Sequence, residues 1–144
     1  VEAKAVVLQQ SFSADEDTLA LELTAAYDVP SLKRLVRTFI FSKTGNGVLV
    51  VKDRAEFFEP TSFEGALITF DECKQLDDGA LCISNNKDAL RVDVETNGNP
   101  YTISYQQINE DLPVDRLPMR IGISLNNPVK EAVVIMTIQP ENSD

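Results

Sequence analysis

Apolar residues recur at every second position along much of this chain, and this pattern constrains the fold more than any other feature. In segments 19–23, 90–94, 101–105 and 119–125, an apolar side chain alternates with a small, polar or charged one. Successive side chains of a β-strand point to opposite faces of its sheet, so a period of two is typical of strands with one buried face. Residues 132–138 form an almost unbroken apolar run rich in β-branched side chains, which predicts a central strand covered on both faces.

Turn-forming residues separate these segments at short intervals. They lie at 28–30, 45–47, 77–79, 97–100 and 126–128, and consist mostly of Asp, Asn, Gly and Pro. No segment shows the sustained i, i+3, i+4, i+7 spacing of an amphipathic helix. The sequence therefore predicts an all-β fold, an antiparallel β-sandwich of about ten strands with little or no helix.

The length of 144 residues suits one domain, so we expect a single β-sandwich spanning 1–144. The chain begins at Val1, with no basic segment followed by an apolar signal segment. We therefore expect a C-terminal fragment of a larger protein. No apolar run approaches the roughly 20 residues that a membrane-spanning helix needs, so we predict no membrane partner.

The formal charge of −10 argues against nucleic-acid binding, which requires an excess of Lys and Arg for the phosphates. His is absent, which removes the usual general base and the commonest metal ligand. The acidic turns at 15–17, 71–72 and 77–78 lack the defined pattern of a calcium loop. We therefore assign no catalytic residue, no metal and no cofactor to this chain, and expect the acidic turns to be solvated.

Two cysteines are too few for a four-cysteine zinc site. Cys73 and Cys82 flank the turn at 77–78, and an index sum of 155 would place them opposite each other in a hairpin. They form either one disulfide across that hairpin or two free thiols, and the sequence does not choose between these states.

The hairpin formed by 32–42 and 48–57 admits two registers. Its Asn-Gly tip suggests a two-residue turn, which gives an odd index sum and places Phe41 opposite Lys52. An even sum near 90, from a three-residue loop, instead pairs Phe41 with Leu49. A slip of one residue moves every side chain to the other face, so matching of core residues favours the even register.

The even register gives the charged residues of this hairpin two different roles. It places Arg37 opposite Asp53 on the core side, where we expect a structural ion pair, although Arg37 held by Asp53 could alternatively clamp a substrate carboxylate. It gathers Arg34, Lys52 and Arg54 on the outer face. Segment 33–54 carries six basic residues and one acidic residue, so this outer face is a candidate surface for an acidic domain or a polyanionic sugar. Ordinary solvated charge is the alternative.

Three tyrosines are candidates for stacking on sugar rings, and Tyr27 could also serve as a proton donor. Tyr101 and Tyr105 share the strand phase of Ile103, so we expect both rings in the core. The chain has no Trp, which argues against a flat aromatic platform for sugar binding.

Three stretches resemble the C-terminal β-sandwich domain of the heparinase II/III-like polysaccharide lyases. Residues 23–27 are Leu-Thr-Ala-Ala-Tyr, 37–39 are Arg-Thr-Phe, and 48–53 are Val-Leu-Val-Val-Lys-Asp. The family has a matching "DLTAAY" stretch, an "RT" step in the next strand, and a "GVLVVxD" strand. Residues 88–92 and 134–140 are similar to later strands of that domain, so the likeness extends over about 3–140.

This resemblance implies that the parent protein is a secreted or periplasmic polysaccharide lyase, although this chain alone is not an enzyme. Such lyases cleave uronic-acid-containing polysaccharides, glycosaminoglycans among them, by β-elimination in an N-terminal helical domain. The chain would then be a non-catalytic accessory domain whose partner is that helical domain, with an anionic polysaccharide as a second candidate partner. An independent carbohydrate-binding or protein-interaction module is the alternative. An exposed apolar patch would favour the accessory domain, and a polar groove with exposed aromatics would favour the module.

Overall fold

The computed structural model describes residues 3–109 and 115–141, and within them the regular structure consists of eleven β-strands and one short 3-10 turn, η1 (Thr24–Ala26). The strands are β1 (Val6–Phe12), β2 (Glu16–Glu22), β3 (Leu32–Ser42), β4 (Val48–Thr61), β5 (Glu64–Thr69), β6 (Glu72–Gln75), β7 (Leu81–Ser84), β8 (Ala89–Glu95), β9 (Tyr101–Gln107), β10 (Met119–Leu125) and β11 (Val129–Pro140). No helix among the described residues is long and apolar enough to cross a membrane.

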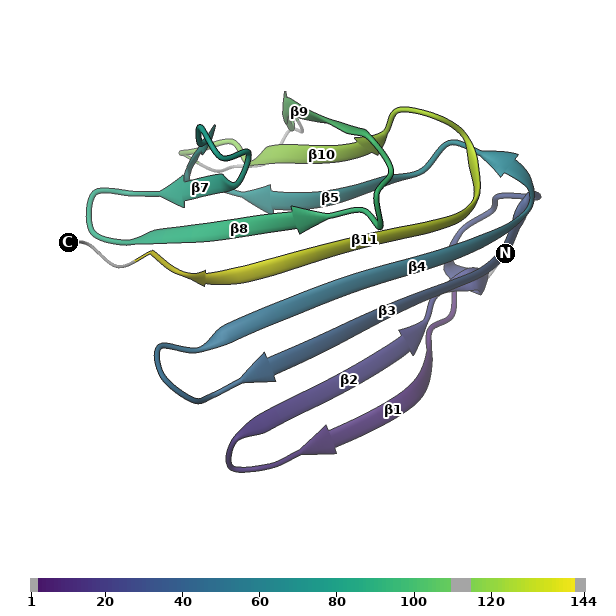
Figure 1. The fold of residues 1–144 in the computed structure, drawn as a ribbon, viewed down its shortest axis with the longest axis horizontal. Coiled ribbons are helices and arrows are strands. Elements are labelled where there is room, and N and C mark those ends of the chain that lie inside the picture. Colours follow the sequence, from purple (N-terminus) through teal and green to yellow (C-terminus); the bar gives the residue numbers. More distant parts are fainter. Residues whose placement is uncertain (1–2, 110–114, 142–144) are drawn as a thin grey trace.

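The strands form two antiparallel sheets of unequal width (Figure 1). The larger sheet has eight strands in the order β1-β2-β3-β4-β11-β8-β7-β6, and the smaller has three in the order β5-β10-β9. The predicted all-β antiparallel sandwich is confirmed. The run 132–138 lies in β11, which is central in the larger sheet as predicted. Only its inner face is deeply buried, however, because no layer within the described ranges covers the outer side chains of Val133 and Ile135.

The hairpin of β3 and β4 has the even register that core matching predicts. Phe41 pairs with Leu49 and Arg37 pairs with Asp53. The connecting loop spans five residues, 43–47, rather than three. Gly45 and Gly47 both have positive φ, at 62° and 83°, a backbone conformation that Gly adopts without a steric penalty. These two glycines let a longer loop keep the register that the core requires.

The core lies where the smaller sheet covers β4, β11, β8 and β7. Ile121 and Ile123 of β10 and Val134 of β11 are fully buried between the two sheets. Burying one such side chain stabilises a fold by about 1.5–3 kcal/mol. Gly65 of β5 packs against the larger sheet, since a Cβ at this position would lie 3.4 Å from Val134 Cγ1. The small size of this residue therefore lets β5 approach β11 closely.

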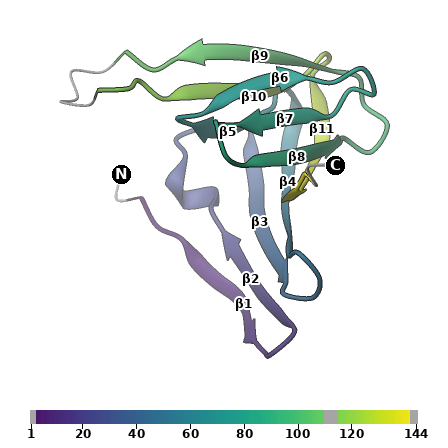
Figure 2. The same cartoon turned by 90° about the vertical axis from the view of Figure 1, so that its left-hand side faces the viewer.

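Strands β1 and β2, together with residues 39–42 of β3, extend beyond the smaller sheet, and we call this region the wing. Figure 2 shows β1 and β2 directed away from the layer formed by β5, β10 and β9. All seven residues of β1 are exposed. The larger sheet thus has a covered half and an uncovered half.

The hairpin of β6 and β7 has a register one residue away from the one considered for a disulfide. Cys73 pairs with Ile83, and Cys82 pairs with Lys74, so the index sum is 156. Neighbouring side chains of a strand point to opposite faces, so this slip sends the two sulfurs to opposite sides of the sheet. Both thiols are free, and the Cys82 thiol donates to Glu141 Oε2 at 3.1 Å.

Candidate functional site

The paired residues Arg37 and Asp53 form a bidentate ion pair at the edge of the core. Arg37 Nε donates to Asp53 Oδ1 at 2.6 Å, and Arg37 Nη2 donates to Asp53 Oδ2 at 2.7 Å. The Asp53 side chain is 3% exposed and that of Arg37 is 31% exposed. The hydrogen bonds that Arg37 donates to Asp53 raise the pKa of Arg37, against the lowering effect of burial. The pair has the geometry of a register-fixing contact, with one side of the guanidinium still open to solvent.

That open side faces a cavity of about 360 Å³ between β3 and β5. Its walls are part apolar, including Leu35, Phe57 and Phe63, and part polar. Tyr27 also lines it, and its ring is exposed. Tyr27 follows η1 in the Leu-Thr-Ala-Ala-Tyr stretch, and Arg37 and Asp53 belong to the other two stretches, so all three segments that carry the family resemblance meet at this cavity.

The charges around the cavity are balanced. Besides Arg37 and Asp53, the lining contains Arg120 of β10 and Glu64 of β5, which form an ion pair. Hydrogen bonds to Glu64 from Ser124 and Arg120 lower its pKa, the Ser124 bond being the larger cause. The cavity therefore presents two cations and two anions, already paired.

The basic outer face contains Arg34, Lys52 and Arg54, and all three side chains are exposed. The structure brings carboxylates to this face from distant parts of the chain. Arg54 Nη2 lies 2.5 Å from Glu131 Oε1 of β11, a partner 77 residues away in sequence. Lys52 and Arg54 share a shallow hollow with Glu131 and Glu95. These acidic neighbours reduce the positive potential that the sequence of 33–54 predicts.

The Glu131 contact was missed because no local pattern signals it. Glu131 lies in β11, which becomes a neighbour of β4 only through the sheet order. Across that strand pair, Glu131 lies opposite Glu56 and Val133 opposite Arg54.

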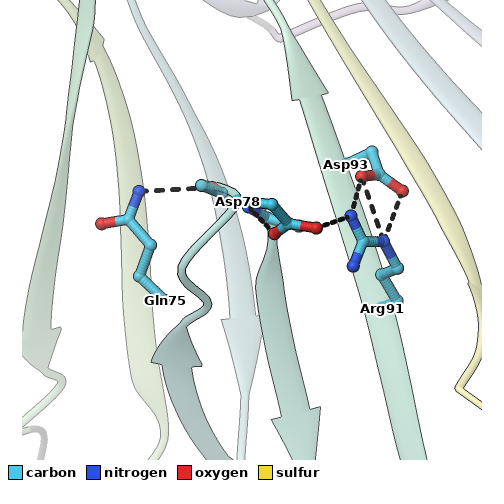
Figure 3. Close-up of polar contacts among 6 residues, drawn as sticks. Gln75, Asp78, Arg91 and Asp93 are labelled. Atoms are coloured by element: carbon cyan, nitrogen blue, oxygen red, sulfur yellow. Dashed lines mark hydrogen bonds and ion pairs between the residues drawn. The ribbon is translucent and has the colours of Figure 1, made fainter.

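A second polar cluster lies on the outer face of β8 (Figure 3). Arg91 donates through Nε and Nη2 to Asp93, and through Nη2 to Asp78 Oδ2 at 2.6 Å. These hydrogen bonds raise the pKa of Arg91, that to Asp93 being the largest cause. Gln75 donates to the carbonyl of Gly79 at 3.2 Å in the same turn. The cluster ties the turn between β6 and β7 to β8, so Arg91 has a structural role here.

The inner face of the wing carries uncovered apolar side chains, with the charged Asp17 between two of them. Phe12 lies opposite Asp17, Asp17 opposite Phe41, and Phe41 opposite Leu49, so these residues share one face of the sheet. This is the face whose side chains form the core in β4. Phe12 is 64% exposed and Phe41 is 41% exposed.

Leu19 and Phe39 form the adjoining row of the wing, and Val7 and Leu21 lie opposite each other in the next. We call this surface the apolar wing face. It comprises Val7, Phe12, Leu19, Leu21, Phe39 and Phe41. Exposed apolar side chains that share one face of a sheet mark a surface that is normally covered.

The tyrosines differ from one another in their surroundings. Tyr101 packs against the core as predicted, whereas the Tyr105 ring is exposed, and its prediction as a core residue was wrong. Tyr105 shares a shallow hollow with the exposed ring of Phe70, because both lie near the open end of the smaller sheet. Burial nevertheless raises the pKa of Tyr105. Phe70 was not singled out from the sequence.

No group of three or more His, Cys, Asp or Glu side chains in the described ranges is placed to hold a metal ion. Acidic residues of these turns instead pair with basic side chains from distant parts of the chain. Asp71 pairs with Arg116, and Asp17 pairs with Lys43 at 2.7 Å.

Comparison with known proteins gives a structural match only. No family model and no curated sequence matches the chain. A crystal structure of heparinase III matches with a TM-score of 0.72 at 15% identity, and the heparinase III BT4657 gene product matches with a TM-score of 0.73 at 11% identity. A mutant of the heparan sulfate lyase HepC from Pedobacter heparinus matches with a TM-score of 0.69 at 12% identity.

These matches cover 97%, 96% and 98% of this chain but only 22% of each solved chain. The chain thus spans about a fifth of the length of the proteins that it resembles. The aligned region accounts for almost the whole of both sheets described above. The chain has the fold of a β-sandwich region found in heparinase III structures, as its sequence motifs predict.

Proposed function

We propose that this chain is a non-catalytic accessory β-sandwich domain of a heparinase-like polysaccharide lyase. The apolar wing face is the observation that carries the proposal. A domain that works alone rarely leaves several large apolar side chains uncovered on one face, whereas a domain that packs against a neighbour needs such a surface. The match to only part of each heparinase III chain agrees with this arrangement.

The chemistry of the described residues supports a non-catalytic role. Abstraction of a proton next to a uronate carboxylate needs a positioned base and a means of stabilising the resulting negative charge. The chain has no His, and the guanidinium of Arg37 is already held by Asp53. We therefore propose that β-elimination of uronic-acid-containing polysaccharides takes place in a separate helical domain of the parent protein. A periplasmic or extracellular location follows from such substrates.

The test uses the polypeptide encoded directly upstream of Val1. It should contain a helical domain that binds this chain when the two are expressed together. The double variant Phe12→Ser with Phe41→Ser should weaken the binding strongly, because both side chains lie on the apolar wing face. Phe58→Ser is the matched control, since Phe58 of β4 is 66% exposed and neighbours the inward-facing Phe57 in sequence. Equal effects of the two changes would contradict docking through the wing.

A second candidate function is an independent carbohydrate-binding module. The exposed rings of Tyr105 and Phe70 favour it, because they share a hollow with the polar side chains of Asp71, Gln107 and Arg116. Sugar rings stack on such aromatic faces. Titration with heparan sulfate oligosaccharides should then shift the resonances of these two rings, and Phe70→Ala should weaken the binding. Unchanged ring resonances at saturating oligosaccharide would exclude this module.

A further inference from the structure

Strand β5 is an edge strand whose outer edge has no partner among the described strands. It pairs only with β10 and has no bulge. The amide of Leu125 donates to the carbonyl of Phe63 at 3.0 Å, so residue 63 directs its backbone groups toward β10. Backbone groups alternate in direction along an antiparallel strand, so those of Glu64, Ala66 and Ile68 point away from β10.

Natural sheets usually protect such edges with Pro, Lys, a bulge or a covering segment. The sequence of β5 is Glu-Gly-Ala-Leu-Ile-Thr, which has neither Pro nor Lys. Edge strand β6, by comparison, is short and contains Glu72 and Lys74. The free edge of β5 is therefore open to pairing with another strand.

The position of β5 over the larger sheet determines what an added strand would contact. A Cβ at Gly65 would lie 3.4 Å from Val134 of β11 and 3.9 Å from Asp53 Oδ2 of β4. Neighbouring strands lie about 4.8 Å apart, so one more strand beyond β5 would lie over β3. The inward side chains of β3 there are Leu35 and Arg37, and these two residues line the cavity described above.

The charge balance of the cavity determines the chemistry of the occupant. Arg37 uses Nε and Nη2 to bind Asp53 and retains further N–H groups for another acceptor. A second carboxylate would place two anions against one guanidinium in a partly buried site, where desolvating an extra charge is costly. An amide or hydroxyl oxygen satisfies the remaining N–H groups at no such cost.

We propose that the free edge of β5 is a strand-docking site for an extended, uncharged polypeptide segment. An Asn, Gln, Ser or Thr side chain of the segment lies over Arg37, and apolar side chains lie two positions to either side. Its main chain pairs with Glu64, Ala66 and Ile68, and so widens the three-stranded sheet toward the wing. The origin of the segment, the remainder of a larger lyase, rests on the proposed function, whereas the docking site itself does not.

The test is a titration of the isotope-labelled chain with the acetylated and amidated peptide Ser-Val-Thr-Asn-Thr-Val-Ser, which is uncharged and presents Val, Asn and Val on one face. The amides of Glu64, Ala66 and Ile68 should shift and become protected from hydrogen exchange. Ala66→Pro removes an outward N–H and should weaken binding by about tenfold. Tyr105→Pro is the matched control, because the same alternation points the Tyr105 backbone away from β10 at the opposite edge. This change should leave the peptide affinity unaltered.

Two further binding experiments identify the chemistry of the occupant. A peptide with Asp in place of Asn should bind more weakly, and sodium glucuronate should not displace the Asn peptide. Shifts confined to β1 or β9, tighter binding of the Asp peptide, or displacement by glucuronate would overturn the proposal. None of these results depends on the upstream polypeptide. A failure of the docking site can therefore be distinguished from a failure of the proposed accessory function.

Discussion

The covered half and the wing of the larger sheet differ in burial although both have apolar side chains on the same face. Val134 of β11 lies between the sheets with no exposed surface, whereas Phe12 of β1 is 64% exposed. Across the sheet, Val51 of β4 is buried, Phe39 of β3 is half-buried and Gln10 of β1 is exposed within a single row. The alternation of apolar residues therefore indicates which face of a strand is apolar. The position of the smaller sheet determines which strands are buried on that face.

The largest expected effect comes from the inner face of the smaller sheet, which covers that half. Ile123→Ala removes a fully buried side chain and leaves a cavity between the sheets, so we expect a loss of about 2–5 kcal/mol in the free energy of unfolding. Urea unfolding monitored by circular dichroism measures this loss. A loss below about 1 kcal/mol would show that the two sheets pack loosely, and would remove the contrast with the wing.

The next effect concerns the ion pair at the boundary between the two halves. Asp53→Ala leaves Arg37 partly buried without its partner, and we expect a loss of about 2–3 kcal/mol, between the values for exposed and fully buried pairs. Replacing both residues, with Arg37→Leu and Asp53→Val, should restore much of this stability, because apolar replacements of buried pairs are often neutral.

Glu131→Ala is the control for this pair. It breaks the contact with Arg54, in which both side chains are more than half exposed, so the loss in the free energy of unfolding should be much smaller than for Asp53→Ala. Urea melts of the four proteins compare the two pairs directly. Equal losses for Asp53→Ala and Glu131→Ala would show that burial does not distinguish them.

The sequence predicts the register of a strand pair correctly where core side chains must be matched across the pair. Matching Phe41 with Leu49 predicts the register of β3 and β4, and hence the contact of Arg37 with Asp53, because a wrong register would bury charges. The register of β6 and β7 rests on the turn alone, and there the prediction for Cys73 and Cys82 is one residue out.

Features that depend on sheet order lie beyond sequence reasoning. Glu131 meets Arg54 only because β11 lies beside β4, and neither strand carries a local signal of that neighbour. The division into eight and three strands is equally hidden, because β2 in the wing alternates as regularly as a covered strand does. The apolar wing face was consequently not predicted residue by residue.

A smaller effect on stability is expected when the pH is lowered, because Glu64 on the outer face of β5 becomes protonated. The pKa of Glu64 lies below its ordinary value of 4.5, so ionised Glu64 stabilises the fold above that pH. This contribution is lost as the pH falls through the lowered pKa. Wild-type protein should be more stable than Glu64→Gln at pH about 6, and the difference should be smaller at pH about 3. The side chain is one-third exposed, so solvent keeps the effect small.

Urea midpoints at the two pH values measure this difference. Glu59→Gln, at an exposed position near the end of β4, controls for the change in net charge. A stability difference between wild type and Glu64→Gln that grows as the pH falls would reverse the sign and exclude the assignment.

The smallest effect on stability is expected in the wing. Phe12→Ser removes a ring that is already mostly in water, so we expect a change within about 0.5 kcal/mol in the free energy of unfolding. The same substitution should clearly reduce binding of the dye ANS, because Phe12 belongs to the apolar wing face, where a dye contacts several side chains at once. Phe58→Ser, at a similarly exposed ring outside that face, should leave dye binding unchanged. A loss of 2 kcal/mol or more for Phe12→Ser, in the range of about 2–5 kcal/mol for core truncations, would mean that the wing has a core of its own. The contrast between the two halves would then fail, and with it the reason to expect a partner over β1 and β2.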